Sequence, residues 1–165
     1  MGPKLPPARF VKTVLKSFMA ESGLEPRLLP HLRVTNAVEG KVDFELDITK
    51  DHTNRLKILH GGTIASMVDL GGSLAVASKG LFATGVSTDL NVTYLSGGGK
   101  IGDKIQATAT CDKMGMTLAY TSVVFKNSKG ELAARGSHTK HVSKAWQAQS
   151  EPFTLPEDAD IAAEE

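Results

Sequence analysis

The fold is decided by the stretch Leu59-His60-Gly61-Gly62-Thr63-Ile64-Ala65-Ser66-Met67-Val68-Asp69-Leu70-Gly71-Gly72. It begins as a two-glycine turn and continues as a helix that is apolar on nearly every side. A helix without a broad polar stripe is normally surrounded by other structure. The sequence therefore predicts a buried central helix, with the rest of the chain wrapped around it.

Two features of this stretch indicate a chemical site. The first N–H groups of a helix are unpaired and carry the positive end of its dipole, and glycines such as Gly61 and Gly62 let a ligand oxygen approach them closely. Asp69 is the second feature, because a carboxylate in an apolar helix is costly unless it is paired, hydrogen-bonded or used. The residues one turn away from Asp69 are small, so another surface is expected to pack closely against this face: Ala65, Ser66, Gly72 and Ser73.

The separation of these two features predicts an assembly. Gly61 and Asp69 are eight residues apart, which is roughly 12 Å along a helix that rises ~1.5 Å per residue. One reacting carbonyl group cannot touch both groups of the same chain. If both act on it, one of them comes from a second copy, which predicts a two-fold dimer with the site at its seam.

Composition narrows the class of protein. The chain has 165 residues, 41% hydrophobic and 22% charged, as expected for one globular domain with a proper core. The sequence contains no run of eighteen apolar residues, so it predicts no membrane-spanning helix. The single Cys111 favours a reducing compartment. Aromatic residues make up only 5%, and the lack of a basic and aromatic strip argues against nucleic-acid binding.

The charges are unevenly distributed. The net charge is +1, but six of the 18 acidic residues lie in the last fifteen positions, so residues 1–150, with all 19 Lys and Arg, carry about +7. A basic body suits an anionic ligand. A solubilising surface is the alternative interpretation of the same charge.

The start of the chain has helical periodicity. Phe10, Val11, Val14, Leu15 and Phe18 recur at helical spacing after Pro6-Pro7, and Gly23 ends the run. A structural helix that covers the domain is the preferred interpretation, with residues 1–24 as an N-terminal helical segment. The basic character also allows a mitochondrial presequence. The expected location is therefore cytoplasmic or mitochondrial.

The remaining segments predict the fold class. Alternating apolar and polar residues, separated by turn residues, predict six strands. Their ranges are His31 to Val38, Lys41 to Thr49, Thr84 to Tyr94, Asp103 to Asp112, Thr117 to Asn127 and Glu131 to Val142. This order predicts an α+β domain over residues 25–145, with an antiparallel sheet wrapped around the central helix. Residues 146–165 are predicted to form an acidic flexible tail.

Several short motifs resemble one family. In chain order they are His52-Thr53-Asn54, Leu59-His60-Gly61-Gly62, Asp69, Val86 to Tyr94, and His138-Thr139-Lys140-His141. This series resembles the hotdog-fold acyl-CoA thioesterases, most closely the PaaI-like branch that includes eukaryotic acyl-CoA thioesterase 13. The resemblance covers about residues 10–143. It implies a hotdog fold, hydrolysis of acyl-CoA without a metal or other cofactor, and a homotetramer built as a pair of dimers.

The resemblance also implies roles for particular residues. The backbone amide of Gly61 and the side chain of Asn54 would polarise the thioester carbonyl, with His60 in a supporting role. Asp69 from the partner's helix would activate water, and Ser87 would help to hold that water. These residue types suit the chemistry, because N–H donors stabilise the developing oxyanion by on the order of 3 kcal/mol each. Burial of a carboxylate raises its pKa and improves it as a base.

Coenzyme A would be held along the strand turns in this family. The matching positions are Tyr94, Lys113, Gly115, Met116, Thr117, Leu118 and His141. The sequence departs from the family at two places: a lysine is common where Met116 stands, and Gly97 replaces a usual proline.

Some alternatives stay open at this level. Asp69 could act as a base or form a transient anhydride, and the acyl group could be medium-chain, long-chain or aryl. The chain could also be a hotdog protein that binds acyl-CoA without catalysis, or a hotdog dehydratase or hydratase. His138 and His141 are three residues apart on a predicted strand, so they face opposite ways and cannot hold one metal ion.

Overall fold

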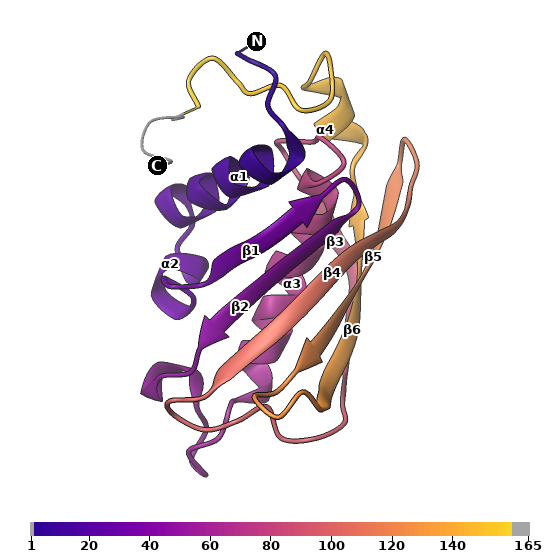
Figure 1. Ribbon diagram of the computed structural model, residues 1–165. Coiled ribbons are helices and arrows are strands. Elements are labelled where there is room, and N and C mark those ends of the chain that lie inside the picture. Colours follow the sequence, from indigo (N-terminus) through magenta and orange to yellow (C-terminus); the bar gives the residue numbers. More distant parts are fainter. Residues whose placement is uncertain (1, 160–165) are drawn as a thin grey trace.

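A computed structural model describes residues 2–159 and contains one antiparallel sheet around one long helix (Figure 1). The α+β prediction is confirmed. The elements in chain order are α1 (Pro7–Glu21), α2 (Leu24–Leu28), β1 (Arg33–Val38), β2 (Lys41–Asp47), the 3-10 turn η1 (Lys50–His52), α3 (Gly61–Ala77), β3 (Val86–Tyr94), β4 (Lys104–Met114), β5 (Leu118–Lys126), β6 (Leu132–His141) and α4 (Ser143–Gln147). The six predicted strands are all present, with ends that differ by at most two residues. The short elements α2, η1 and α4 were not predicted.

The order of the strands leaves β3 at an edge. The six strands follow the order β1-β2-β4-β5-β6-β3, and every neighbouring pair is antiparallel. The chain crosses from β2 to the far edge of the sheet through α3, so β3 pairs only with β6. Most side chains of β3 are exposed. An edge strand presents unpaired backbone groups that can pair with another chain.

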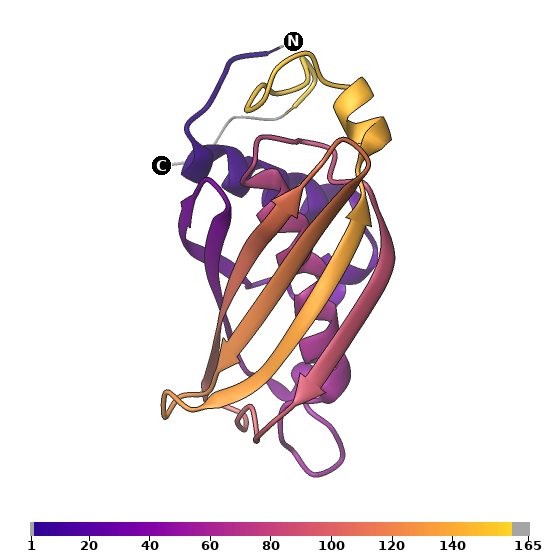
Figure 2. The same ribbon diagram turned by 90° about the vertical axis from the view of Figure 1, so that its right-hand side faces the viewer.

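The helix α3 lies across one face of the sheet (Figure 2). Most of its residues are buried, as the apolar sequence predicts, and most of its apolar side chains belong to one core cluster with Phe44, Val123 and Phe125. Two glycines bring the helix close to the strands. A Cβ atom at Gly71 would lie 2.8 Å from the ring of Phe44, and one at Gly72 would overlap the ring of His138.

The two ends of the chain pack against each other. The amide of Gly2 donates to the carbonyl of Leu155 at 2.6 Å, and the amide of Leu5 donates to that of Phe153 at 2.9 Å. Leu155 is fully buried, and the ring of Phe153 lies 5.5 Å from that of Phe10 in α1. The structure therefore differs from the flexible tail expected after residue 146, because Phe153 and Leu155 complete the core around α1. Residues 160–165 of the predicted tail lie outside the described residues.

This packing leads to a stability prediction. Leu155→Ala is expected to lower the free energy of unfolding by about 3 kcal/mol, because a fully buried leucine leaves a cavity when it is shortened. Urea unfolding followed by circular dichroism measures this change. Glu151→Ala changes an exposed side chain in the same segment, and its effect is expected to stay within about 0.5 kcal/mol. Equal stability of the two variants would contradict the packing.

Within residues 2–159, none of the helices has the length and apolar character that a membrane crossing requires.

Candidate active site

The start of α3 presents a free backbone donor. His60 is the N-cap residue, and its Nδ1 accepts a hydrogen bond from the amide of Gly62 at 2.7 Å. The amides of Thr63 and Ile64 bond to the carbonyl of His60. Among residues 2–159, the amide of Gly61 has no hydrogen-bond partner. It is therefore available to a ligand oxygen, at the positive end of the helix dipole.

Asn54 lies in the loop that leads to this helix. Its Oδ1 accepts a hydrogen bond from the amide of Leu56 at 2.9 Å, while its Nδ2 has no partner in the described chain. Thr53 forms a β-bridge with Leu59, and the amide of His60 donates to the carbonyl of His52 at 2.8 Å. These contacts hold the two ends of the loop together. The Nδ2 of Asn54 is thereby available as a side-chain donor in the loop that leads to Gly61.

Buried His52 anchors the same loop. Its Nδ1 bonds to the amide of Thr49 at 2.9 Å, and its Nε2 lies 2.7 Å from the carbonyl of Leu28. Tyr94 ties the other side of the site to β3, because its hydroxyl donates to the carbonyl of Gly61 at 2.7 Å. The start of α3 is thus attached to the end of the edge strand.

Asp69 is exposed in the single chain, contrary to the predicted buried carboxylate. It lines a hollow of about 280 Å³ together with residues of α2 and its C-cap, α3 and β3: Leu24, Glu25, Leu29, Ala65, Ser66 and Leu90. Its carboxylate has no hydrogen-bond or ion-pair partner within the described residues. Most of the helix is buried, but among residues 2–159 no element covers the side chain of Asp69, which is exposed.

Sequence reasoning missed the contact between the exposed Ser87 and the buried His138. The Oγ of Ser87 lies 2.6 Å from Nε2 of His138, a residue with no exposed surface. The other ring nitrogen, Nδ1, packs over Gly72 and is buried without a hydrogen-bond partner in residues 2–159. Burial lowers the pKa of His138 below its ordinary value, and the charge of Lys140 lowers it further, while Asp69 opposes the shift. Ser87 therefore rests against an imidazole that favours its neutral form.

The residues predicted to hold coenzyme A lie at two opposite ends of the sheet, with Tyr94 apart from the other six. Lys113, Gly115, Met116, Thr117 and Leu118 belong to the β4–β5 hairpin, and Leu118 pairs with His141, which pairs with Val86. Tyr94 lies at the opposite end of β3, beside Gly61. Eight residues of strand separate Val86 from Tyr94, a span of about 26 Å. Figure 1 accordingly shows the hairpin at one end of the sheet and the start of α3 at the other.

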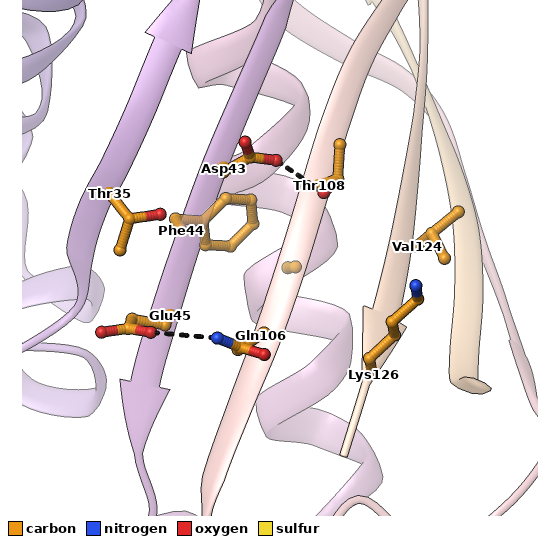
Figure 3. A pocket seen from close by; sticks show the side chains of 9 residues that line it. Thr35, Asp43, Phe44, Glu45, Gln106, Thr108, Val124 and Lys126 are labelled. Carbon is orange, nitrogen blue, oxygen red and sulfur yellow. Dashed lines mark hydrogen bonds between the residues drawn. The ribbon is translucent and has the colours of Figure 1, made fainter. Parts of the chain in front are cut away.

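A second hollow lies on the outer face of the sheet, away from α3 (Figure 3). It has a volume of about 300 Å³ and is lined mainly by polar side chains of β1, β2, β4 and β5. Thr108 donates to Asp43 at 2.6 Å, and Gln106 bonds to Glu45 at 3.4 Å. None of the site residues predicted from the sequence lines this hollow.

Comparisons with known proteins agree with this architecture. Residues 56–134 match the model of the family described as "Thioesterase superfamily", and the chain belongs to this superfamily. A Schizosaccharomyces pombe protein with a proposed esterase activity is 43% identical over 90% of this chain and 92% of its own length. Human acyl-coenzyme A thioesterase 13 is 39% identical over 80% of this chain and 94% of its own. The crystal structure of zebra fish thioesterase superfamily member 2 superposes with a TM-score of 0.72 at 39% identity, over 79% of this chain and 94% of that one.

Proposed function

We propose that this protein hydrolyses acyl-CoA thioesters to free acid and CoA, at a site shared by two copies of the chain. The observation that carries the proposal is a pair of unpartnered groups. Within residues 2–159, neither the Gly61 amide at the start of α3 nor the exposed Asp69 carboxylate on the same helix has a hydrogen-bond partner. The name of the human relative supports acyl-CoA as the substrate.

The chemistry requires donors on one side of the thioester and a base on the other. Attack of water on the carbonyl carbon places negative charge on the carbonyl oxygen, which the Gly61 amide and the Asn54 Nδ2 stabilise. Asp69 takes a proton from the attacking water. The tetrahedral intermediate then breaks its C–S bond, the CoA thiolate leaves and is protonated, and the acid remains. His60 supports this arrangement as the helix cap. Formation of an anhydride on Asp69 is the alternative route.

The free edge of β3 suggests how two copies meet. An antiparallel β3–β3 pair centred on Leu90, the middle of the strand, would bring Ser87 of the partner subunit opposite Thr93. Thr93 is next to Tyr94, whose hydroxyl bonds to Gly61. Such a pair would also cover the strip that carries Asp69. Ser87 of one copy would then lie close to the carbonyl-binding group of the other.

The same pairing accounts for the divided coenzyme A residues. An antiparallel pair brings the Val86 end of one β3 next to the Tyr94 end of the other. The Tyr94 and Gly61 of one copy would thus lie beside the hairpin and His141 of its partner. Lys113 and the basic body of residues 1–150 would attract the phosphates of CoA. Assembly of two such dimers into a homotetramer, an acyl group that is medium-chain, long-chain or aryl, and a location in the cytoplasm or mitochondrion are further parts of the proposal, supported by the family resemblance.

Thiol release from a panel of acyl-CoAs tests the function. Acetyl-, octanoyl-, palmitoyl- and phenylacetyl-CoA are incubated with the protein, and a thiol reagent detects free CoA. Catalytic thiol release is expected with at least one of the longer or aryl substrates. Binding of the same CoAs in calorimetry without thiol release would identify a non-catalytic binder. Hydration of an enoyl-CoA, seen as loss of its conjugated absorbance without free thiol, would identify a hydratase.

A further inference from the structure

Lys140 is a buried cation that the reaction above does not use. Only 4% of its surface is exposed. It lies on β6, two residues from His138. Its Nζ donates to the Oγ of Ser73 at 2.5 Å and is 3.3 Å from the Oγ1 of Thr84. No carboxylate in residues 2–159 lies within 4.0 Å of this ammonium group. Its direct partners are therefore two neutral hydroxyl groups.

A buried ammonium without an ion-pair partner is an expensive way to fill a core. An apolar side chain of the same length would fill the space without the cost of desolvation. This cost is visible in the titration of the group, because burial lowers the pKa of Lys140 to about 8 while the charges of Asp69 and Glu25 oppose the shift. A perturbed charge next to a candidate site is a reason to look for a function.

The neighbours of Lys140 show what its charge acts on. Asp69 on α3 and Glu25 on α2 attract the ammonium from two elements. His138 lies on the same inward face of β6, and Lys140 opposes the protonation of its imidazole. Asp89 on β3 has the opposite effect, because its negative charge raises the pKa of His138. In the sheet, Lys140 is also the register partner of Ser87.

We propose that Lys140 is a positioning residue whose buried ammonium keeps His138 uncharged, so that Nε2 of His138 accepts a hydrogen bond from the hydroxyl of Ser87. The inference rests on the proposed hydrolysis. With its proton turned toward His138, the Ser87 oxygen accepts a hydrogen from the attacking water. Asp69 accepts the other hydrogen, and a lone pair of the water remains free to attack the carbonyl carbon.

Protonation of His138 would reverse this arrangement. An imidazolium cannot accept from Ser87, so the hydroxyl would turn its proton toward the water. The hydroxyl then no longer accepts a hydrogen from that water but withdraws electron density from one of its lone pairs, which makes the water a weaker nucleophile. In the neutral form, the imidazole proton is on Nδ1. This nitrogen packs over Gly72 on α3 and has no hydrogen-bond partner within residues 2–159.

The pH dependence of kcat/KM tests the proposal. Lys140→Met removes the charge that disfavours imidazolium, so the pKa of His138 is expected to rise. The acid limb of the profile then moves to higher pH, by about two units for a like charge two strand residues away at an effective dielectric constant of ~20. The double variant Lys140→Met/His138→Gln has no imidazole at this place, and its acid limb is expected to match that of His138→Gln alone.

Lys41→Met is the matched control. It removes one positive charge from an exposed position on β2, and its profile is expected to coincide with that of the wild type. Thermal unfolding of Lys140→Met shows whether the variant is folded. If it does not fold, Ser73→Ala provides a second variant, because loss of the 2.5 Å contact displaces the ammonium and is expected to move the limb in the same direction.

An NMR titration separates this inference from the proposed function. The His138 signal, identified by its loss in His138→Gln, gives the pKa of the imidazole in wild type and in Lys140→Met without any substrate. A higher pKa in the variant together with a displaced acid limb supports the role. An unchanged pKa, or an unchanged profile in a folded Lys140→Met protein, overturns it. Absence of hydrolysis by the wild type would instead reject the proposed function.

Discussion

Asp69→Asn is expected to lower kcat for acyl-CoA hydrolysis by about a thousandfold, with little change in the fold. A positioned general base typically contributes a factor of this size, and the asparagine amide cannot accept the proton of the attacking water. The side chain has no hydrogen-bond or ion-pair partner within residues 2–159 and is exposed in the single chain. Its replacement therefore breaks no contact on which folding depends. Steady-state thiol release measures the loss, and thermal unfolding checks the fold.

Asp43→Asn provides the control for this variant. Asp43 lies on the outer face of the sheet, where it accepts a hydrogen bond from Thr108 that an asparagine can also accept (Figure 3). The same chemical change there is expected to leave kcat within a factor of about two, since it touches no part of the proposed site. Unchanged turnover in a folded Asp69→Asn protein would remove the assigned base.

The fold could be predicted from the sequence because its signals are local. Val42, Phe44, Leu46 and Ile48 alternate with charged residues, which locates β2 and its inward face. The apolar run after Gly61 predicts α3 in the same way. The ends of the chain are different. Phe153 and Leu155 become core residues through contacts with α1 and with the N-terminal segment, some 150 residues away in the chain, and no local pattern reports such contacts.

The candidate site was only partly predictable for the same reason. A free amide at Gly61 could be predicted because the sequence locates the start of the helix, where the first backbone amides are unpaired. His138 and Lys140 depend on tertiary packing, and only one signal could have found them. They share the inward face of β6 with Ala134 and Gly136. The alternation of inward and outward residues along this strand would therefore have predicted that the His138 imidazole and the Lys140 ammonium are buried. The exposure of Asp69 escaped prediction because local sequence does not tell which strip of a buried helix is left uncovered.

Mixing two inactive variants is expected to restore activity if two chains share each site. Asn54→Asp keeps the oxygen that accepts from Leu56 but replaces the Nδ2 donor with a negative charge beside the oxyanion. Loss of one such donor typically costs about 10² to 10³ in kcat. Asp69→Asn lacks the base. Each variant alone is therefore expected to be nearly inactive in thiol release, for reasons located at different ends of the proposed site.

Random pairing of the two chains makes half of all dimers mixed. In a mixed dimer, one site joins the intact Asn54 and Gly61 of the Asp69→Asn chain to the intact Asp69 of the other chain, while the second site contains both substitutions. Co-expression in equal amounts is therefore expected to give about one quarter of the wild-type activity per chain. If each chain instead held a complete site, every site in the mixture would carry one substitution, and activity would stay at the level of the separate variants. Restoration of activity is expected because Gly61 and Asp69 are separated by roughly 12 Å of helix, which one thioester carbonyl cannot span within a single chain.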